Sequence, residues 1–192
     1  VVAASPIVRE LKNRYPQEMV VVSVVTATGH RMAQKIIPEA DGHIFFPFDL
    51  PVITERIVDI VNPKAIILIE TELWPNFLRL AWHKKIPVMM MNGRISDRSM
   101  KRYSLIRRFT SRMLLQIKKF CMQSGIDAEH IISMGALSDR VTITGNTKYD
   151  ETYVEVSEEE KQQLRHEFHF DGKGPVIVAG STHNGEEEII LR

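Results

Sequence analysis

Apolar and polar positions along the chain form two alternating patterns. Short β-branched runs such as MVVVSVV (19–25) and AIILI (65–69) are continuous and uncharged, which is typical of strands buried on both faces of a sheet. Between such runs lie longer stretches whose apolar residues have helical spacing, as at 51–61 and 75–83. Strands that alternate with helices predict a parallel sheet covered by helices on both faces, so the expected fold class is α/β.

The same patterns locate the individual elements. Because Asp49 precedes the predicted helix at 51–61, we expect its carboxylate to cap that helix. Helices are predicted at 2–14, 30–37, 51–61, 75–83, 96–117, 127–134 and 157–168, and strands at 19–25, 43–46, 65–69, 87–91, 119–123, 141–144 and 175–179.

A segment without periodicity at 150–156 predicts a domain boundary. Beyond it, Ser157 followed by three glutamates has the form of a helix N-cap with an acidic first turn. We therefore expect one domain at 1–150, and a connector with the truncated start of a second domain at 151–192. The sequence begins and stops within predicted helices, so we expect a fragment of a longer protein.

Composition narrows the possible classes of protein. The 192 residues carry 25 Lys and Arg against 24 Asp and Glu, a formal net charge of +1 that argues against a general polyanion binder. Cys121 is the only cysteine, which excludes an intrachain disulfide and a cysteine-based metal cluster. No apolar run approaches the roughly 18 residues that span a bilayer.

The loop ETELWPN (70–76) follows a predicted buried strand, where ligands of open α/β sheets bind. It holds two carboxylates, Glu70 and Glu72, before a Trp-Pro pair that fixes the backbone. A carboxylate held there can orient or deprotonate a hydroxyl group. Alternatively, one glutamate caps the following helix and the other is solvated.

A second loop, GSTHNGEEE (180–188), lies at a predicted strand-to-helix turn. Backbone N–H groups and hydroxyls at a helix N-terminus can bind an anion, although the three glutamates would oppose one unless they point away. The loop lacks the Gly-Lys-Ser/Thr ending of a Walker motif. The histidines have no metal-binding spacing apart from the pair at 166 and 169, which lies on an acidic helix of ordinary surface character, so we predict no metal site.

The segment 94–119 is basic and amphipathic. Nine Lys and Arg side chains are opposed only by Asp97, and apolar residues are interleaved among them. The segment could contact anionic lipid headgroups or a phosphorylated lipid substrate. It could equally be a solvated helix whose apolar side packs on the sheet. Nucleic acid is less favoured, because the aromatic residues do not form a stacking platform.

Several loops together resemble one family in sequence order. ETELWPN (70–76), NGRIS (92–96), TGNTKYD (144–150) and GSTHNGEEE (180–188) are similar to motifs of lipid A-specific 3-deoxy-D-manno-octulosonic acid (Kdo) transferases, and TATGH (26–30) and FPFDLP (46–51) also fit. The resemblance implies a GT-B fold, in which two Rossmann-like domains enclose the active site. In this chain they would be an acceptor-side domain at 1–150 and the start of the donor domain at 151–192.

The resemblance also implies an activity. The family transfers Kdo from CMP-Kdo to a sugar hydroxyl of a lipid A precursor in lipopolysaccharide biosynthesis, at the cytoplasmic face of the inner membrane. The transfer inverts the anomeric centre and needs no metal or cofactor. Its general base is expected in a turn after the first strand, directly upstream of Val1, and a membrane-anchoring segment is expected further upstream. This chain alone is therefore predicted to be inactive.

Matching the motifs residue by residue implies roles for individual side chains. Glu72 is the first choice for a catalytic carboxylate and Glu70 the second. The acceptor-binding residues are expected to be Asn92, Arg94 and Thr28, and the donor-binding residues Ser181, Thr182, His183, Lys148 and Asn146. We expect the turn of Glu72 to face the turn of Ser181 across a crevice between the domains.

Two other functions remain open. One is a GT-B-fold sugar-nucleotide epimerase, which shares the paired domains but needs no lipid acceptor. The other is a non-enzymatic module that binds a membrane surface through the basic segment.

Overall fold

The computed structural model describes residues 1–150, 156–170 and 177–191, except for the side chains at 101, 102, 104 and 105. The chain divides into two compact units, Val1–Glu151 and Thr152–Arg192. Each unit is described by itself, and the identity of the second unit as the start of a donor domain remains a prediction.

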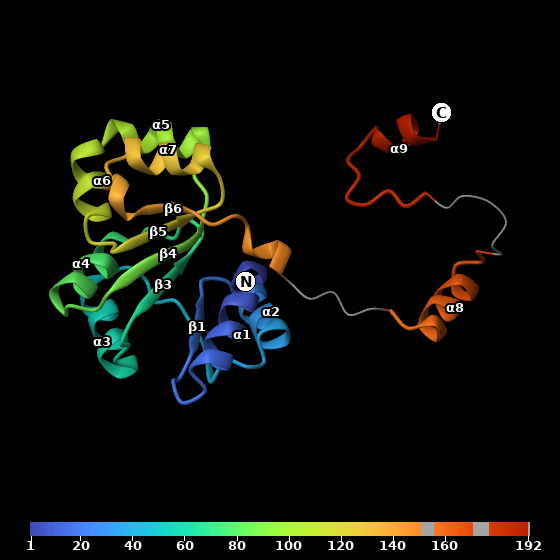
Figure 1. Cartoon of the computed structure of the whole chain (residues 1–192), viewed down its shortest axis with the longest axis horizontal. Coiled ribbons are helices and arrows are strands. Elements are labelled where there is room, and N and C mark those ends of the chain that lie inside the picture. The colour runs from blue at the N-terminus through green and yellow to red at the C-terminus, as the bar shows by residue number, and fades with distance from the viewer. Residues whose placement is uncertain (151–155, 171–176, 192) are drawn as a thin grey trace. The chain divides into compact units, whose positions relative to one another are not determined.

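The first unit contains two parallel sheets (Figure 1). Strands β1 (Val21–Val24) and β2 (Gly42–Phe45) form one, and β3 (Ile66–Ile69), β4 (Val88–Gly93), β5 (Lys119–Met122) and β6 (Val141–Ile143) form the other in that order. Every pairing is parallel, as predicted. The expectation of one sheet was wrong, because β1 and β3 are not paired with each other.

Helices connect the strands of the first unit. Most lie where the apolar spacing predicts them, and α3 and α4 match their predicted bounds. The helical region expected at 96–117 is divided at Ile106 into two helices. The helices are α1 (Ser5–Arg14), α2 (Ala27–Ile36), α3 (Pro51–Val61), α4 (Pro75–His83), α5 (Asp97–Leu105), α6 (Arg107–Leu114) and α7 (Gly125–Ser133), with short 3-10 turns η1 (Val2–Ala4), η2 (Ser138–Arg140) and η3 (Thr147–Asp150).

The hydrophobic core lies around the four-stranded sheet. Side chains of β4 and β5, including Met90, Phe120 and Met122, are fully buried. Leu78 of α4 and Leu114 of α6 are buried in the same cluster. This core fixes the positions of the strand ends from which the candidate site residues project.

The expected role of Asp49 was wrong in one respect. Its carboxylate accepts hydrogen bonds from the backbone N–H groups of Asn76 (3.0 Å) and Phe77 (2.8 Å), so it caps α4 and not α3. The Asn76 side chain in turn donates to the Asp49 carbonyl at 2.7 Å. Asp49 therefore joins the FPFDLP segment to the ETELWPN loop.

The second unit contains helices α8 (Glu158–Glu167) and α9 (Glu186–Ile190). Ser157 forms the predicted N-cap of α8, with a reciprocal capping box to Glu160. The strand predicted at 175–179 lies partly outside the described residues, and no strand forms over 177–179. Ile177 and Val178 are 80% and 85% exposed, because no described strand pairs with them there.

None of the helices in the described part of the chain is long and apolar enough to cross a membrane.

Candidate functional site

The turn after β3 carries the first predicted carboxylate. Glu70 adopts a left-handed backbone conformation (φ 63°), and its side chain forms an ion pair with Lys148 at 3.3 Å. Its backbone N–H donates to the Met91 carbonyl of β4. The Thr71 hydroxyl donates to the carbonyl of Arg94, which ties this turn to the turn after β4.

Glu72 lies next in this turn and is exposed. One of its carboxylate oxygens accepts a hydrogen bond from the Trp74 indole at 3.0 Å. The Trp74 ring packs against Phe46 with 5.2 Å between centroids, and Phe46 also contacts the Phe77 ring. The aromatic packing fixes Trp74, and Trp74 restrains the Glu72 carboxylate at the open edge of the sheet.

Asn92 lies at the carboxyl end of β4 and is fully buried, with φ 55°. Its side-chain oxygen accepts a hydrogen bond from the Thr147 backbone N–H at 3.0 Å, and its carbonyl accepts one from Gln123 at 3.0 Å. The Asn92 Nδ2 atom is buried without a hydrogen-bond partner. In this structure Asn92 therefore holds the segment after β6 in place, while Nδ2 is left without a bond.

The TGNTKYD segment is attached to the first unit at several points. Thr147 donates its hydroxyl proton to the Ala3 carbonyl at 2.9 Å. The side-chain oxygen of Asn146 accepts the Lys148 backbone N–H at 3.1 Å, which shapes the turn. Lys148, predicted to bind the donor, thus lies beside Glu70.

Residues in and next to α7 form hydrogen bonds with the NGRIS loop, and the sequence did not predict these contacts. Asp127 is buried and accepts the Ile95 backbone N–H at 2.8 Å, while its other oxygen accepts the Ser124 hydroxyl proton. A His130 ring nitrogen lies 2.9 Å from the Ile95 carbonyl. The Ser124-x-x-Asp127 spacing was a usable signal for the cap, but nothing in the sequence linked it to Ile95.

Two predicted acceptor-binding residues are less constrained. Arg94 has an exposed side chain on the turn after β4. Thr28 is exposed in the first turn of α2, which follows β1 and is capped by the Thr26 hydroxyl accepting the Gly29 N–H at 3.0 Å. The structure therefore brings Glu70, Asn92, Asn146 and Lys148 together, whereas Thr28 follows a strand of the other sheet.

The predicted anion-binding turn of the second unit is occupied by its own glutamates. The Thr182 hydroxyl donates to Glu187 and the His183 backbone N–H donates to Glu186 at 2.8 Å. The hydrogen bond from Thr182 lowers the pKa of the Glu187 carboxyl below its ordinary value. Ser181, predicted with them, has φ 57°.

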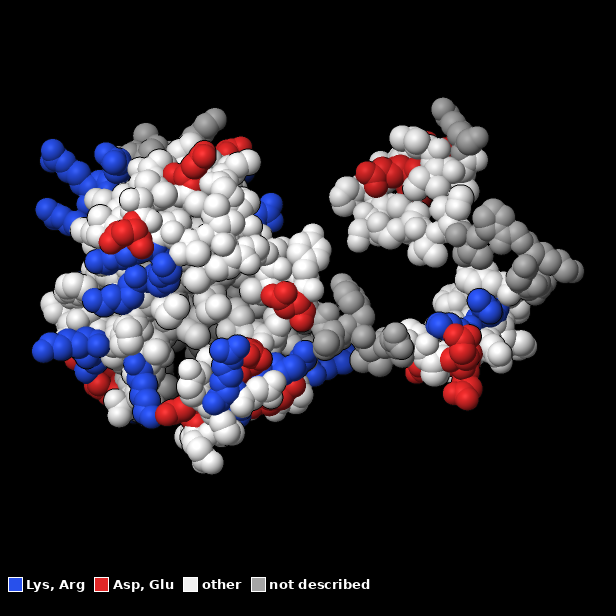
Figure 2. All heavy atoms as spheres, viewed as in Figure 1, with Lys and Arg blue, Asp and Glu red and all other residues white. Residues whose placement is uncertain are grey.

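Basic side chains gather over the helices α5 and α6 (Figure 2). One side of α6 is buried through Thr110, Met113 and Leu114. Ile106, which precedes α6, and Phe109 within it are 52% and 54% exposed. Among the side chains that the structure describes in this region, the exposed cations are Arg98, Arg107, Arg108, Arg112 and Lys118.

Among the residues that the structure describes, no group of three or more His, Cys, Asp or Glu side chains could hold a metal ion.

Comparison with known proteins identifies relatives of the whole chain. The family of 3-deoxy-D-manno-octulosonic-acid transferases (Kdo transferases) matches residues 1–151. A 3-deoxy-D-manno-octulosonic acid transferase from Haemophilus influenzae is 35% identical over 192 residues, which are 100% of this chain and 44% of that protein. A bifunctional glycosyltransferase/methyltransferase from Fusobacterium nucleatum is 39% identical over 90% of this chain and 27% of its own length. The chain thus spans less than half of these relatives.

Solved structures show the same fold at low sequence identity. The UDP-GlcNAc 2-epimerase from Neisseria meningitidis, solved with UDP-GlcNAc, superimposes with a TM-score of 0.57 at 16% identity. The match covers 88% of this chain and 51% of the epimerase. The predicted fold class, a Rossmann-like α/β domain of GT-B type, is confirmed.

Proposed function

The chain belongs to the Kdo transferase family, and from this premise we propose that it forms part of a glycosyltransferase that moves Kdo from CMP-Kdo to a lipid A precursor. The observation that carries the proposal is the polar edge after β3 and β4. There, Glu70 and Asn92 both contact the TGNTKYD segment, and three of the family-like motifs meet. The predicted role of this edge is to receive the acceptor hydroxyl.

The proposed chemistry is a single displacement with inversion. The acceptor hydroxyl oxygen forms a bond to the anomeric carbon of Kdo while the bond from that carbon to the CMP phosphate oxygen breaks. The hydroxyl proton passes to a carboxylate base, and CMP leaves as an anion. Glu72 and Glu70 orient the acceptor or stabilise the positive charge that develops on the sugar, by analogy with glycosidases. No metal or cofactor takes part in the proposed step.

Lys148 has two possible partners in this proposal. It is paired with Glu70 in this structure, and both side chains are about half exposed (49% and 46%). Departure of CMP develops negative charge that a cation can stabilise. We propose that Lys148 turns from Glu70 to the donor phosphate or the Kdo carboxylate when the donor binds.

Donor binding by the second unit requires a rearrangement of its turn. Thr182 and His183 now donate to Glu187 and Glu186. The anionic sugar donor could bind this turn only if the Thr182 hydroxyl and the His183 N–H were free to donate hydrogen bonds to it. We propose that the two glutamates leave the turn when CMP-Kdo is bound, and that Ser181 and Asn146 complete the donor site.

The acceptor would be presented at the cytoplasmic face of the inner membrane. The exposed residues in and next to α6 include arginines together with Ile106 and Phe109, a composition that favours contact with anionic headgroups and the upper acyl region. This contact is proposed as an addition to catalysis and not as a separate, non-enzymatic function. Liposome sedimentation tests it: loss of salt-sensitive binding is expected after Arg108→Glu with Arg112→Glu, but not after Arg56→Glu on α3.

The epimerase hypothesis has less support. Its relatives among solved structures share the fold at identities near 16%, and the match of residues 1–151 is to the transferase family. The test is to incubate the longer polypeptide that contains this chain with CMP-Kdo and lipid A precursor. A lipid product heavier by one or more Kdo residues, with release of CMP, is expected. Release of an epimerised free sugar without lipid would contradict the proposal.

A further inference from the structure

The NGRIS loop (92–96) is held by hydrogen bonds along its whole backbone. Each of its five carbonyls accepts a hydrogen bond from a residue outside the loop. The donors, in loop order, are the Gln123 side chain, the Gln123 N–H, the Thr71 hydroxyl, the His130 ring and the Met100 N–H. Three of these donors are side chains, so the loop depends on individual residues elsewhere in the fold as well as on backbone bonding.

Both backbone polar groups of Ile95 are bonded to side chains of α7. The Ile95 N–H donates to the Asp127 carboxylate at 2.8 Å, and the Nδ1 atom of His130 donates to the Ile95 carbonyl at 2.9 Å. Asp127 and His130 are three residues apart, a spacing that places both side chains on one face of a helix. Ile95 itself is 2% exposed and lies in the hydrophobic core. We call these two contacts the Ile95 clamp.

The His130 ring also joins the clamp to the start of α5. A carbonyl oxygen can only accept a hydrogen bond, so the Nδ1 atom that faces Ile95 carries a proton. The other ring nitrogen, Nε2, lies 3.4 Å from a carboxylate oxygen of Asp97, the first residue of α5. The His130 side chain is 15% exposed, whereas that of Asp97 is 82% exposed. The ring is therefore largely enclosed and has a polar contact on each side, which restricts its rotation.

Arg94 projects from the segment that the clamp holds. It lies directly before Ile95 and two residues after Asn92, which is fully buried. Arg94 is exposed, and its backbone carbonyl accepts the Thr71 hydroxyl proton. An arginine on a fixed backbone loses less conformational freedom on binding a partner than an arginine on a mobile loop. The fixed backbone therefore favours binding of a substrate group by this guanidinium.

We infer that Asp127 and His130 are positioning residues for acceptor binding, which act through the Ile95 clamp to aim the Arg94 side chain. The inference rests on the proposed function, because the proposed reaction supplies the acceptor that Arg94 is expected to bind. Neither Asp127 nor His130 lies in the segments that carry the family resemblance, which end at residue 96 and resume at residue 144. Their contribution is to the geometry of the site and not to the chemical step.

Steady-state kinetics of the longer polypeptide separate positioning from a general loss of structure. His130→Ala removes the donor to the Ile95 carbonyl, and a displacement of about 1 Å at a substrate-binding group can cost roughly 100-fold in rate. We expect the KM for the lipid acceptor to rise by about tenfold or more, whereas the KM for CMP-Kdo should change by less than about twofold.

Two further variants control this measurement. His130→Gln retains an N–H donor and should recover part of the loss in acceptor binding. Glu129→Ala changes the neighbouring exposed residue of α7 and should leave both KM values near those of the parent protein. An unchanged acceptor KM in His130→Ala, or an equal rise in the KM of both substrates, would overturn the inference.

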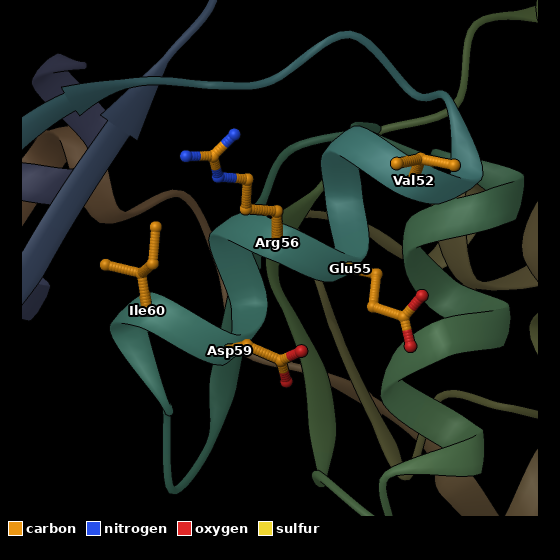
Figure 3. Close-up of a pocket in the computed structure, with 5 residues that line it drawn as sticks. All are labelled: Val52, Glu55, Arg56, Asp59 and Ile60. Atoms are coloured by element: carbon orange, nitrogen blue, oxygen red, sulfur yellow. The ribbon is translucent and has the colours of Figure 1, made fainter.

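A double-mutant cycle shows whether His130 acts through Arg94. If it does, His130→Ala should raise the acceptor KM much less in an Arg94→Ala background than in the parent protein. Arg56→Ala is the matched background, because Arg56 is an exposed arginine on α3. It lines a cavity of about 620 Å³ whose lining residues all belong to α3, and Figure 3 shows it pointing away from the side to which Glu55 and Asp59 point. Equal effects of His130→Ala in the two backgrounds would contradict action through Arg94.

Amide hydrogen exchange in the longer polypeptide tests the clamp without any need for transfer activity. His130→Ala is expected to speed exchange of the Ile95 N–H by about tenfold or more, while amides of Val141–Ile143 should change little. Transfer by the parent protein together with unchanged exchange at Ile95 would refute the inference alone. Absence of transfer by the parent protein would instead refute the proposed function, and with it the acceptor as the group that the clamp serves.

Discussion

Three of the predicted site residues hold a left-handed backbone conformation: Glu70 (φ 63°), Asn92 (φ 55°) and Ser181 (φ 57°). For most residues other than glycine this conformation costs roughly 1–2 kcal/mol, and asparagine adopts it more readily. Such strain persists where surrounding contacts hold it, and it occurs often at functional sites. At Glu70 those contacts are the ion pair with Lys148 and the bond to the Met91 carbonyl.

Gly135 at the end of α7 is required by both its backbone and its surroundings. A Cβ there would lie 2.4 Å from the Ser111 Cβ and 2.9 Å from its Cα, at φ 115°. Gly135→Ala is therefore expected to lower the free energy of unfolding by about 2–4 kcal/mol. Gly145→Ala is the matched control, because Gly145 also has positive φ but nothing within 4 Å. Equal losses in urea unfolding would contradict the proposed clash.

Asp41 links α1 to the start of β1 and makes stability depend on pH. Hydrogen bonds from the Val20 N–H and from Lys12 lower the pKa of its carboxyl below the ordinary 3.8. A lowered native pKa contributes stability above the unfolded value, and that contribution is lost as the pH falls through the native pKa. Asp41→Asn should therefore destabilise the chain at neutral pH and converge with the parent protein as the pH falls through the lowered native pKa of Asp41. If the urea midpoints of Asp41→Asn and the parent protein differed by the same amount at neutral and at acid pH, this role of Asp41 would be excluded.

At the scale of elements, motifs that are distant in sequence support one another. Asp49 of FPFDLP caps α4, whose first turn contains the end of ETELWPN, and Phe46 packs on Trp74. A proline at the first position of α3 and another at the first position of α4 fix where each helix begins. The start of each helix could therefore be predicted from the sequence. Which helix Asp49 caps depends on tertiary contacts, so sequence spacing favoured the wrong one.

Asp49→Ala is expected to destabilise the chain by about 0.5–2 kcal/mol through the loss of the α4 cap. Asp49→Asn keeps an acceptor oxygen and should lose less. The readout is the urea midpoint together with amide exchange at Phe77. A larger effect on exchange in α3 than in α4 would contradict the assignment of the cap.

Asn92 joins β4 to the segment that follows β6. Asn92→Gly tolerates the positive φ but removes the acceptor for the Thr147 N–H, so amide exchange at Thr147 should accelerate. A cost of roughly 1–3 kcal/mol is expected if that N–H stays buried without a partner. Gln123→Ala, which removes only the bond to the Asn92 carbonyl, is the control. Unchanged exchange at Thr147 would show that the segment is held by other contacts.

At the scale of the whole molecule, the sequence predicted the α/β class and the position of most elements in the first unit. Apolar periodicity is local, and it therefore locates strands such as Ile66–Ile69 well. It did not predict the separation into two sheets, because the pairing of β1 or β3 depends on which strand lies beside them. In the second unit the apolar run at 177–179 forms no strand, since β structure requires a partner.

The candidate site was predicted in part. The sequence predicted Glu70, Asn92 and Lys148 as site residues from the loops that follow the strands. It did not predict that Glu70 pairs with Lys148, because these residues lie in two motifs that are far apart in the sequence. The hydrogen bond from the Ile95 N–H to Asp127 could not be predicted either, because no sequence pattern around Ile95 or Asp127 indicates a contact between them. The crevice expected between the turns of Glu72 and Ser181 remains a prediction.

The most direct test of the proposed function is the turnover number for Kdo transfer by the longer polypeptide carrying single Glu-to-Gln changes. Glu72→Gln and Glu70→Gln should each reduce turnover by about 100-fold or more, the range expected when a group that orients the acceptor or stabilises developing charge is lost. Glu129→Gln, an exposed glutamate on α7, should leave turnover near that of the parent protein. Full activity of both the Glu72 and the Glu70 variants, with normal folding, would contradict the assignment of this edge to the reaction.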